Sequence, residues 1–411
     1  METVNCDVLI IGAGASGLTA AIMLKRKNVN LNIILAEKLS RVGKKLSVTG
    51  NGRCNISNKD QNISHYHGDT LSAKQILNNF TFDNLKDFFG SIGVLVYEFN
   101  SKKAYPYSLQ ASGVVDALRF EAERLNIKTL TNTEIKKTEF LKTGNTKSGK
   151  YTAFTSFGDE IKINSKYVII SCGGMAGGAQ YGTDGSAYNL LNKIHTMQNP
   201  KPVIVQIKTE NTVTRSLKGI KVTAKVTINN HSDTGEVLFC DYGLSGPPIL
   251  QLSRYCKKND IVSLDLMPEY SEKQITDFIL KRNDLNLTGT DFFAGLLNKR
   301  VGFAILKSLN LQNKNTKYTL KEATLIAKTV KSFNFKYLDT TGFKNAQSTS
   351  GGFLLKEFTE NLCSKKINNL YCTGEILNID GDCGGYNLHW AFASAFAAAN
   401  GILNKELYGK R

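Results

Sequence analysis

Residues 7–17 read Asp7-Val8-Leu9-Ile10-Ile11-Gly12-Ala13-Gly14-Ala15-Ser16-Gly17, and this stretch decides the fold. Val8 to Ile11 is the continuous apolar run of a strand that is buried on both faces. Three glycines follow in the GxGxxG spacing, and the residues after them have the apolar spacing of a helix. This order is typical of a dinucleotide site, because the glycines permit a tight turn and let the backbone approach a pyrophosphate.

A second apolar segment, residues 31–36, ends at Glu37, twenty residues after Gly17. A carboxylate at this place accepts hydrogen bonds from the ribose hydroxyls of an adenosine and repels a 2′-phosphate. A GxGxxG match alone can arise by chance in a chain with 35 glycines. The strand, glycines, helix, second strand and acid together are far more specific, so the sequence predicts an α/β fold that binds an ADP-containing cofactor.

Composition sets broad limits on the rest of the chain. A length of 411 residues allows two or three domains, and 41% hydrophobic and 21% charged residues are ordinary for a globular protein. The first apolar run is short and contains the glycine turn, so we expect no signal peptide, and no run approaches the roughly 20 residues of a membrane span. The eight cysteines form no CxxC pair and no metal spacing. We therefore expect a cytoplasmic protein with reduced thiols and no metal site.

The net charge of +17 is less ordinary. It fits a solvated, lysine-rich surface, and it also fits a polyanionic partner such as nucleic acid, which excess Lys and Arg attract. Basic clusters occur at 41–45, 102–103 and 314–336. The sequence does not show whether these clusters meet on one face, and both interpretations stay open at this point.

Two loops combine glycine or tyrosine with cations. Residues 41–55 are rich in Gly, Asn and Ser and carry four cations, so we predict that this loop follows the cofactor rather than serving as an ordinary surface loop. The turn 102–108 holds two lysines, Tyr105 and Tyr107. Such a turn is usually only a turn, although tyrosines beside lysines also stack on nucleobases.

The remaining pattern predicts a discontinuous domain with an insertion. A buried strand over 167–172 runs into Gly173 and Gly174, which gives a second backbone approach to the ligand. From residue 200 the alternation predicts an antiparallel, barrel-like region with strands at 203–208, 218–228, 236–240 and 261–266, followed by helices over 271–310 and 320–331. The chain returns to a buried strand at 369–373 and ends in an alanine-rich helix over 388–399. The dipole at the start of that helix would stabilise the negative charge of a reduced flavin.

Nearly the whole chain resembles the HI0933-like family of bacterial NAD(P)/FAD-dependent flavoproteins. The motifs that carry the resemblance are GxGxxG, Gly-Lys-Lys at 43–45, and residues 49–55, 105–108, 242–247, 351–352 and 374–387. The resemblance implies a glutathione-reductase-like Rossmann FAD domain that is interrupted by a β-barrel and a helical insertion. It implies no second Rossmann domain for NAD(P)H. We assign residues 1–195 and 340–411 to the FAD domain, 196–268 and 320–339 to the barrel, and 269–319 to the helical insertion.

The resemblance also implies the FAD contacts. They lie in the glycine turn, the acid after the second strand, the cationic loop, one later strand and the C-terminal glycine motifs. The residues are Gly12, Gly14, Ala15, Ser16, Gly17, Glu37, Lys38, Lys45, Asn51, Gly52, Arg53, Cys54, Ile135, Gly374, Glu375, Gly385, Tyr386 and Asn387.

Members of this family resemble either enzymes that reduce a uridine of large-subunit ribosomal RNA to dihydrouridine, or aminoacetone oxidases, or reductases of bile-acid intermediates. The +17 charge favours RNA, so we expect reduction of a uridine in 23S ribosomal RNA, free or in a ribosome precursor, with hydride passed from NAD(P)H through FAD. The alternative is a small-molecule flavin oxidoreductase. Candidate catalytic residues are Cys54 as the acid, Tyr107 as a second candidate acid, and Arg53 to orient the base; the alternative role for Cys54 is that of a buried structural cysteine.

The chain departs from the family pattern at several positions. Cys240 and Asp241 stand where Thr-His is common, so no catalytic histidine is available before the Gly-x-Ser-Gly-Pro turn. His389 and Ala395 replace a common Gln and Gly in the last helix.

Overall fold

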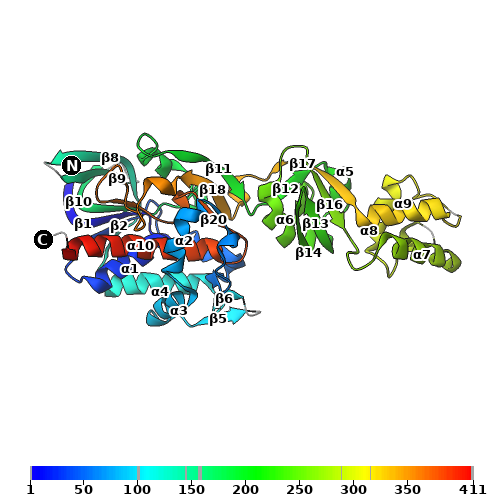
Figure 1. The fold of residues 1–411 in the computed structure, drawn as a ribbon, viewed down its shortest axis with the longest axis horizontal. Helices are drawn as coiled ribbons and strands as arrows, with labels where there is room; N and C mark the ends of the chain where they lie inside the picture. The colour runs from blue at the N-terminus through cyan, green and yellow to red at the C-terminus, as the bar shows by residue number, and fades with distance from the viewer. Residues whose placement is uncertain are drawn as a thin grey trace. The chain divides into compact units, whose positions relative to one another are not determined.

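The computed structural model describes residues 2–99, 102–143, 146–155, 160–287, 289–314 and 316–408. The chain forms two compact units. One consists of residues 1–202 and 347–411, and the other of residues 203–346. The second unit is therefore an insertion in the first; in Figure 1 it carries the green and yellow of the middle of the colour bar, and both ends of the chain belong to the first unit.

The first unit is built on a sheet with a parallel core. Its parallel strands are, in spatial order, β7 (Lys128–Leu130), β2 (Ile33–Ala36), β1 (Glu2–Ile11), β10 (Glu160–Ile170) and β19 (Leu370–Cys372). Ile11 is paired with both Ala36 and Ile170, so these strands end at one edge of the sheet. Ligands of open parallel sheets bind beyond the carboxyl ends of the strands, and this edge is therefore the expected site.

An antiparallel hairpin and three helices complete this layer. The strands β8 (Thr133–Thr143) and β9 (Thr146–Thr155) extend the sheet from β10. Helix α1 (Ala15–Lys27) packs against α4 (Ala111–Arg124) and α10 (Tyr386–Tyr408), as Figure 1 shows. Many of the residues by which α10 packs are small and fully buried, which permits close approach to its neighbours; they include Ala393, Ala395, Ala398 and Ala399.

Smaller elements surround the carboxyl edge of the sheet. They are β3 (Ser57–Asn58), β5 (Val96–Phe99) and β6 (Lys103–Pro106) in one sheet, β4 (Tyr66–Gly68) with β20 (Ile379–Gly381), β11 (Met197–Val203) with β18 (Ser348–Phe353), and the helices α2 (Thr70–Asn78) and α3 (Phe82–Ser91).

The inserted unit is a closed barrel with helices and its own apolar core. The strand order is β12 (Ile207–Thr209), β15 (Gly243–Ser245), β14 (His231–Phe239), β13 (Lys221–Ile228), β16 (Ile261–Asp265) and β17 (Phe333–Thr340). The helices are α5 (Asn211–Ser216), α6 (Pro247–Leu252), α7 (Glu272–Arg282), α8 (Lys299–Ser308) and α9 (Leu320–Lys331). The predicted fold class, a Rossmann domain with an inserted barrel and helices, is confirmed.

Two predicted elements are wrong in detail. The strand expected over 203–208 is interrupted: β11 ends at Val203, β12 begins at Ile207, and Ile204 between them takes a left-handed φ of 51°. The helical region expected over 271–310 is two helices, α7 and α8, and the segment between them contains Gly289 and Gly295 at positive φ. None of the helices in the described ranges combines the length and the apolar character that a membrane span requires.

Candidate functional site

The glycine turn after β1 is shaped by backbone contacts. Gly12 has a φ of 100°, and a Cβ there would lie 2.7 Å from Ser171 O. A Cβ on Gly17 would collide with Gly12 O, so only glycine lets α1 begin this close to the strand. Gly14 differs, because a Cβ on it would meet no heavy atom within 4 Å. Two glycines therefore serve the fold, and the third faces open space.

Glu37 lies directly after β2, and its carboxylate points back to the glycine turn. Its Oε2 accepts a hydrogen bond from Ala13 N (2.9 Å), and its Oε1 accepts one from Leu39 N (2.9 Å). Burial raises the pKa of this carboxyl group, and the two amide hydrogen bonds oppose that change. Each carboxylate oxygen has lone pairs beyond these bonds, so the group can also accept hydroxyl donors.

A polar network joins the amino-terminal and carboxy-terminal parts of the chain at this edge. Lys45 Nζ lies 2.6 Å from Glu375 Oε2, and Glu375 Oε1 accepts a hydrogen bond from Thr349 N. Thr349 Oγ1 in turn accepts hydrogen bonds from the amides of Met175 (2.8 Å) and Ala176 (2.9 Å). Four segments that are distant in sequence are thus held in one arrangement.

The ends of β10 and β19 close the same edge. Ser171 Oγ and Thr373 Oγ1 are 2.9 Å apart, and a Cβ on Gly374 would lie 3.0 Å from Ser16 Oγ at the start of α1. Trp390 Nε1 of α10 donates to Gly374 O. The first and last segments of the chain therefore enclose one site.

The loop at 50–55 has a left-handed path. Gly50, Asn51, Gly52 and Cys54 all have positive φ, between 56° and 81°. Asn51, Gly52 and Arg53 are exposed, whereas Cys54 is fully buried. Burial raises the pKa of the Cys54 thiol to about 12, so the thiol stays protonated at neutral pH.

The start of α10 lies against this loop. Gly385 has a φ of 100°, and a Cβ on it would collide with Ser57 O and lie 2.9 Å from Asn55 Oδ1. Asn387 binds Gly381 through both ends of its amide and also accepts a hydrogen bond from Ser348 Oγ. The first amides of a helix have no intrahelical acceptor and lie at the positive end of its dipole, so they suit an electron-rich group.

These residues fit the FAD that the sequence predicts. Gly14 and Gly52 face open space, where phosphate oxygens can approach the backbone. Asn55 Oδ1 is buried and has no hydrogen-bond partner in the described part of the chain, so a donor from a bound group would satisfy it. The carboxylate of Glu37 fits a ribose at the same place. We call the glycine turn 12–17, Glu37, the loop 50–55 and the segments 374–375 and 385–387 the cofactor cradle.

The structure brings most of the predicted cofactor residues together. Those at the carboxyl edge are Gly12, Gly14, Ala15, Ser16, Gly17, Glu37, Lys45, Asn51, Gly52, Arg53, Cys54, Gly374, Glu375, Gly385, Tyr386 and Asn387. Lys38 forms an ion pair with Asp184, and Ile135 is buried on β8. Tyr107 is 70% exposed and lies just after β6. The contacts of each residue with FAD, and the catalytic roles of Cys54, Arg53 and Tyr107, stay predictions.

Sequence reasoning missed Thr349 and Ser348, which hold the loops around Glu375 and Asn387. The only available signal was their position directly before Gly351 and Gly352, which belong to a family motif.

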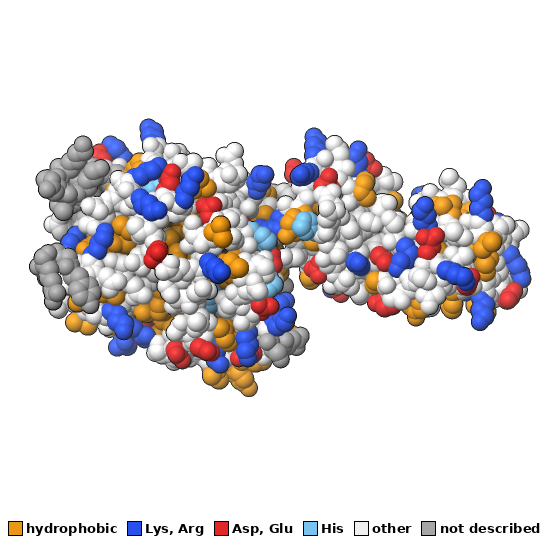
Figure 2. Space-filling view, in the orientation of Figure 1, with side chains coloured by type: hydrophobic (Ala, Val, Ile, Leu, Met, Phe, Trp, Pro, Cys, Tyr) orange, Lys and Arg blue, Asp and Glu red, His pale blue; other side chains and the backbone are white. Residues whose placement is uncertain are grey.

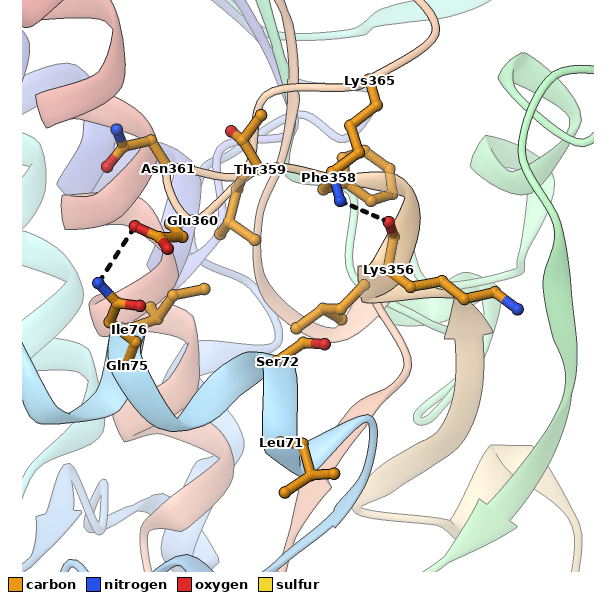
Figure 3. Close-up of a pocket in the computed structure, with 12 residues that line it drawn as sticks. Leu71, Ser72, Gln75, Ile76, Lys356, Phe358, Thr359, Glu360, Asn361 and Lys365 are labelled. Atoms are coloured by element: carbon orange, nitrogen blue, oxygen red, sulfur yellow. Dashed lines mark hydrogen bonds between the residues drawn. The ribbon is translucent and has the colours of Figure 1, made fainter.

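A separate hollow of about 590 Å³ opens between α2 and residues 355–365 (Figure 3). Gln75 Nε2 donates to Glu360 Oε2 across it, and Lys365 Nζ donates to Lys356 O. None of its lining residues belongs to the predicted cofactor site. Because its charged groups do not converge on one point, the hollow itself indicates no chemistry.

The surface cations are not gathered on one unit. The excess of Lys and Arg over Asp and Glu is shared between residues 203–346 and the rest of the chain. On the face in Figure 2, basic side chains alternate with acidic ones over both units. Several are paired, for example Lys218 with Asp241 and Lys331 with Asp265.

Comparison with known proteins identifies relatives over the full length. The family model described as HI0933-like protein Rossmann domain matches residues 6–401. The chain is 31% identical to the 3-dehydro-bile acid delta(4,6)-reductase of Clostridium scindens, over 95% of this chain and 97% of that protein. It is 23% identical to the ribosomal RNA dihydrouridine synthase of Haemophilus influenzae, over 96% of this chain and 98% of that protein.

Solved structures share the fold at lower identity. The chain matches the quinol–fumarate reductase flavoprotein of Escherichia coli with a TM-score of 0.54 and 13% identity, over 100% of this chain and 72% of that one. It matches a 3-ketosteroid-delta4-(5alpha)-dehydrogenase of Rhodococcus jostii with a TM-score of 0.52 and 13% identity, over 96% of each chain.

Proposed function

The chain belongs to the HI0933-like family, and from this we propose that it is an FAD-dependent oxidoreductase that reduces a carbon–carbon double bond conjugated to a carbonyl group. One observation carries the proposal: two relatives that match over nearly their full length have names that describe this one reaction on very different molecules.

The shared chemistry is visible in the two names. A 3-dehydro-bile acid with double bonds at positions 4 and 6 has those bonds conjugated to the 3-oxo group. Dihydrouridine forms from uridine by saturation of the ring double bond that is conjugated to the C4 carbonyl. In both cases the carbon farther from the carbonyl accepts a hydride and the adjacent carbon accepts a proton. One NAD(P)H and one proton are consumed for each bond reduced.

The residues at the carboxyl edge support binding of the cofactor. The glycine turn offers backbone amides to the phosphates, and Glu37 offers a carboxylate to the ribose. When bound, FAD would supply hydride-transfer chemistry, with NAD(P)H as the reductant. The described residues contain a single parallel sheet, so they provide no second Rossmann site for NAD(P)H.

For the substrate we propose a uracil base of 23S ribosomal RNA, free or in a ribosome precursor. The net charge of +17 supports it, because a polyanion gains affinity from excess Lys and Arg and a small neutral substrate does not. The base must leave its stack to reach a flavin. In this proposal Arg53 orients the base, and Cys54 or Tyr107 donates the proton.

A small-molecule enone is the second candidate. The 31% identity to the bile-acid reductase, against 23% to the RNA-modifying relative, favours it. A steroid-like substrate would need a planar apolar site rather than a basic surface.

One experiment separates the candidates. The purified yellow protein is reduced anaerobically with NADH or NADPH and then mixed with unmodified 23S ribosomal RNA or with a conjugated steroid enone. Reoxidation of the flavin and the gain of two hydrogens in the product, read by mass spectrometry, identify the substrate. RNA that gains dihydrouridine supports the first candidate, and a saturated steroid supports the second. A protein that takes up no FAD would contradict the whole proposal.

A further inference from the structure

The hairpin β5–β6 has an unusual distribution of side chains. In its register Tyr97 is opposite Tyr105, and Phe99 is opposite Lys103. Successive side chains of a strand point to opposite faces, so these four lie on one face. The other face carries Val96, Ala104 and Pro106, which are all buried. The face with the aliphatic side chains is thus turned to the core; on the other face Phe99 is exposed and Tyr105 is buried.

Four aromatic rings and one guanidinium group are in contact one after another. We call this set the aromatic row; its members are Arg53, Tyr105, Phe99, Tyr97 and Tyr107. The Arg53 guanidinium lies over the Tyr105 ring at 5.6 Å. Edge-to-face contacts then join Tyr105 to Phe99 (6.2 Å), Phe99 to Tyr97 (6.3 Å) and Tyr97 to Tyr107 (6.0 Å).

Exposure distinguishes this row from a packed core. Tyr107 is 70% exposed and Phe99 is 43% exposed, whereas Tyr105 is buried and fixes the row to the sheet. Edge-to-face pairs stabilise a fold most when they are desolvated, which these outer rings are not. Figure 2 shows hydrophobic side chains at the lower edge of the first unit, where Figure 1 places the hairpin.

The inner end of the row adjoins the cofactor cradle. Ile56 N donates to Ala104 O, and β3 pairs with β6. The backbone of Ser57 in β3 is the group that a Cβ on Gly385 would strike. Arg53 itself belongs to the loop that holds Gly52. The aromatic row therefore borders the site, with Arg53 as the member that belongs to the cofactor loop.

The charge around the row is positive. Lys102 and Lys103 are exposed at the tip of the hairpin, and Arg53 is exposed at its inner end. Among the described residues no carboxylate forms an ion pair with Arg53 or Lys103. Glu98, on the opposite face, is paired with Lys59. Exposed aromatic rings beside unpaired cations are the combination that binds unstacked bases and their phosphates.

We infer that the aromatic row is the surface on which unstacked bases of a single-stranded RNA segment stack beside the flavin site. This inference rests on the proposed function and adds to it the place where the substrate strand lies. Phe99 and Tyr107 supply stacking faces, Lys103 contacts phosphate, and Arg53 meets the base nearest the cofactor. In this arrangement Tyr107 stacks on a base away from the flavin, and Cys54 is the proton donor.

The test measures binding apart from turnover. The FAD-bound protein is titrated into a fluorescently labelled single-stranded uridine oligonucleotide of roughly a dozen nucleotides, at two salt concentrations. Phe99→Ala and Tyr107→Ala are each expected to raise the Kd about five-fold or more, because one stacking face is lost. Phe99→Tyr and Tyr107→Phe, which keep a ring, are expected to stay within about two-fold of the wild type. FAD absorbance of every variant shows that the fold is intact.

An unrelated exposed residue gives the matched control. Leu71 on α2 is 91% exposed and lies outside the row, so Leu71→Ala is expected to leave RNA affinity unchanged. Equal affinity of the alanine variants in the row and the wild type would overturn the inference and leave the proposed reaction standing. A wild type that binds no RNA, with variants that instead raise the KM for a steroid enone, would also overturn it.

Discussion

Lys45 Nζ lies 2.6 Å from Glu375 Oε2, although 330 positions separate these residues in the chain. The side chains are 24% and 18% exposed, so the pair is largely withdrawn from solvent. Glu375 also accepts the Thr349 amide, and the pair therefore ties the loop after β2 to both C-terminal loops of the site. This ion pair therefore holds the segments of the cofactor cradle together.

We expect loss of this ion pair to lower both the free energy of unfolding and the affinity for FAD. Lys45→Met and Glu375→Gln should each lower the free energy of unfolding by about 1 to 3 kcal/mol, between the values for exposed and buried pairs. The double variant should cost less than the sum of the single variants, because it removes both charges, whereas each single variant leaves one charge unpaired. Urea unfolding and FAD titration of all four proteins measure the coupling. Strict additivity would show that the two charges do not interact.

The glycine turn permits a sharper test, because its glycines differ in surroundings. Gly17→Ala places a Cβ against Gly12 O, so we expect it to destabilise the apoprotein. Gly14→Ala meets no atom within 4 Å, and Gly14 has a φ of −85° that alanine adopts freely. It should leave apoprotein stability unchanged and weaken FAD binding about ten-fold or more, because the methyl group occupies the approach of the pyrophosphate. Thermal unfolding without FAD and flavin titration separate these effects. Gly14→Ala with wild-type FAD affinity would place the phosphates elsewhere.

Local signals explain the parts of the fold that the sequence predicts well. The apolar run, glycines and acid between Val8 and Glu37 lie within one βαβ unit, so short-range pattern is sufficient. The helix expected over 320–331 is observed with the same bounds, because Thr319 and Glu322 form a capping box that fixes its start. In such segments the residue propensities, the apolar pattern and the capping residues all indicate the same secondary structure.

The features that the sequence does not predict are contacts between residues distant in the chain and unusual backbone angles. Nothing near Lys45 or Glu375 indicates that they pair, and nothing near Thr349 indicates that its hydroxyl accepts two amides from another loop. Ile204 has a β-branched side chain that favours a strand, and tertiary structure holds it at a φ of 51°. These features depend on the assembled unit.

Cys54 is expected to behave as a protonated, unreactive thiol. Its pKa is raised to about 12 by burial, so alkylation by iodoacetamide should be slow at neutral pH in the folded protein and rapid after unfolding. If this thiol donates the substrate proton, Cys54→Ala should lower kcat about a hundred-fold with little change in FAD content. Mass spectrometry of the labelled protein and steady-state kinetics provide the measurements. Unchanged kcat in Cys54→Ala would assign the residue a structural role and transfer the acid role to Tyr107 or solvent.

His389 in α10 should make stability depend on pH. Its ring is fully buried, Nε2 donates to Phe80 O (3.0 Å), and Nδ1 lies 2.8 Å from Ser57 Oγ, whose hydroxyl can donate to it when the imidazole is neutral. Burial lowers the pKa of His389 to about 4. The histidine of the unfolded chain, with a pKa near 6.5, binds more protons between these pH values. The contribution of His389 to the free energy of unfolding is therefore complete above about pH 6.5 and is lost as the pH falls toward 4, by up to about 3 kcal/mol.

The variant His389→Gln keeps a hydrogen-bond donor and an acceptor without a titrating group. Urea unfolding from about pH 5 to 7.5 measures how the free energy of unfolding depends on pH. This free energy should rise less steeply with pH in His389→Gln than in the wild type. Burial also lowers the pKa of His195, but His195 is present in both proteins and its contribution cancels in the comparison. Identical slopes would mean that the imidazole is not held neutral at this place.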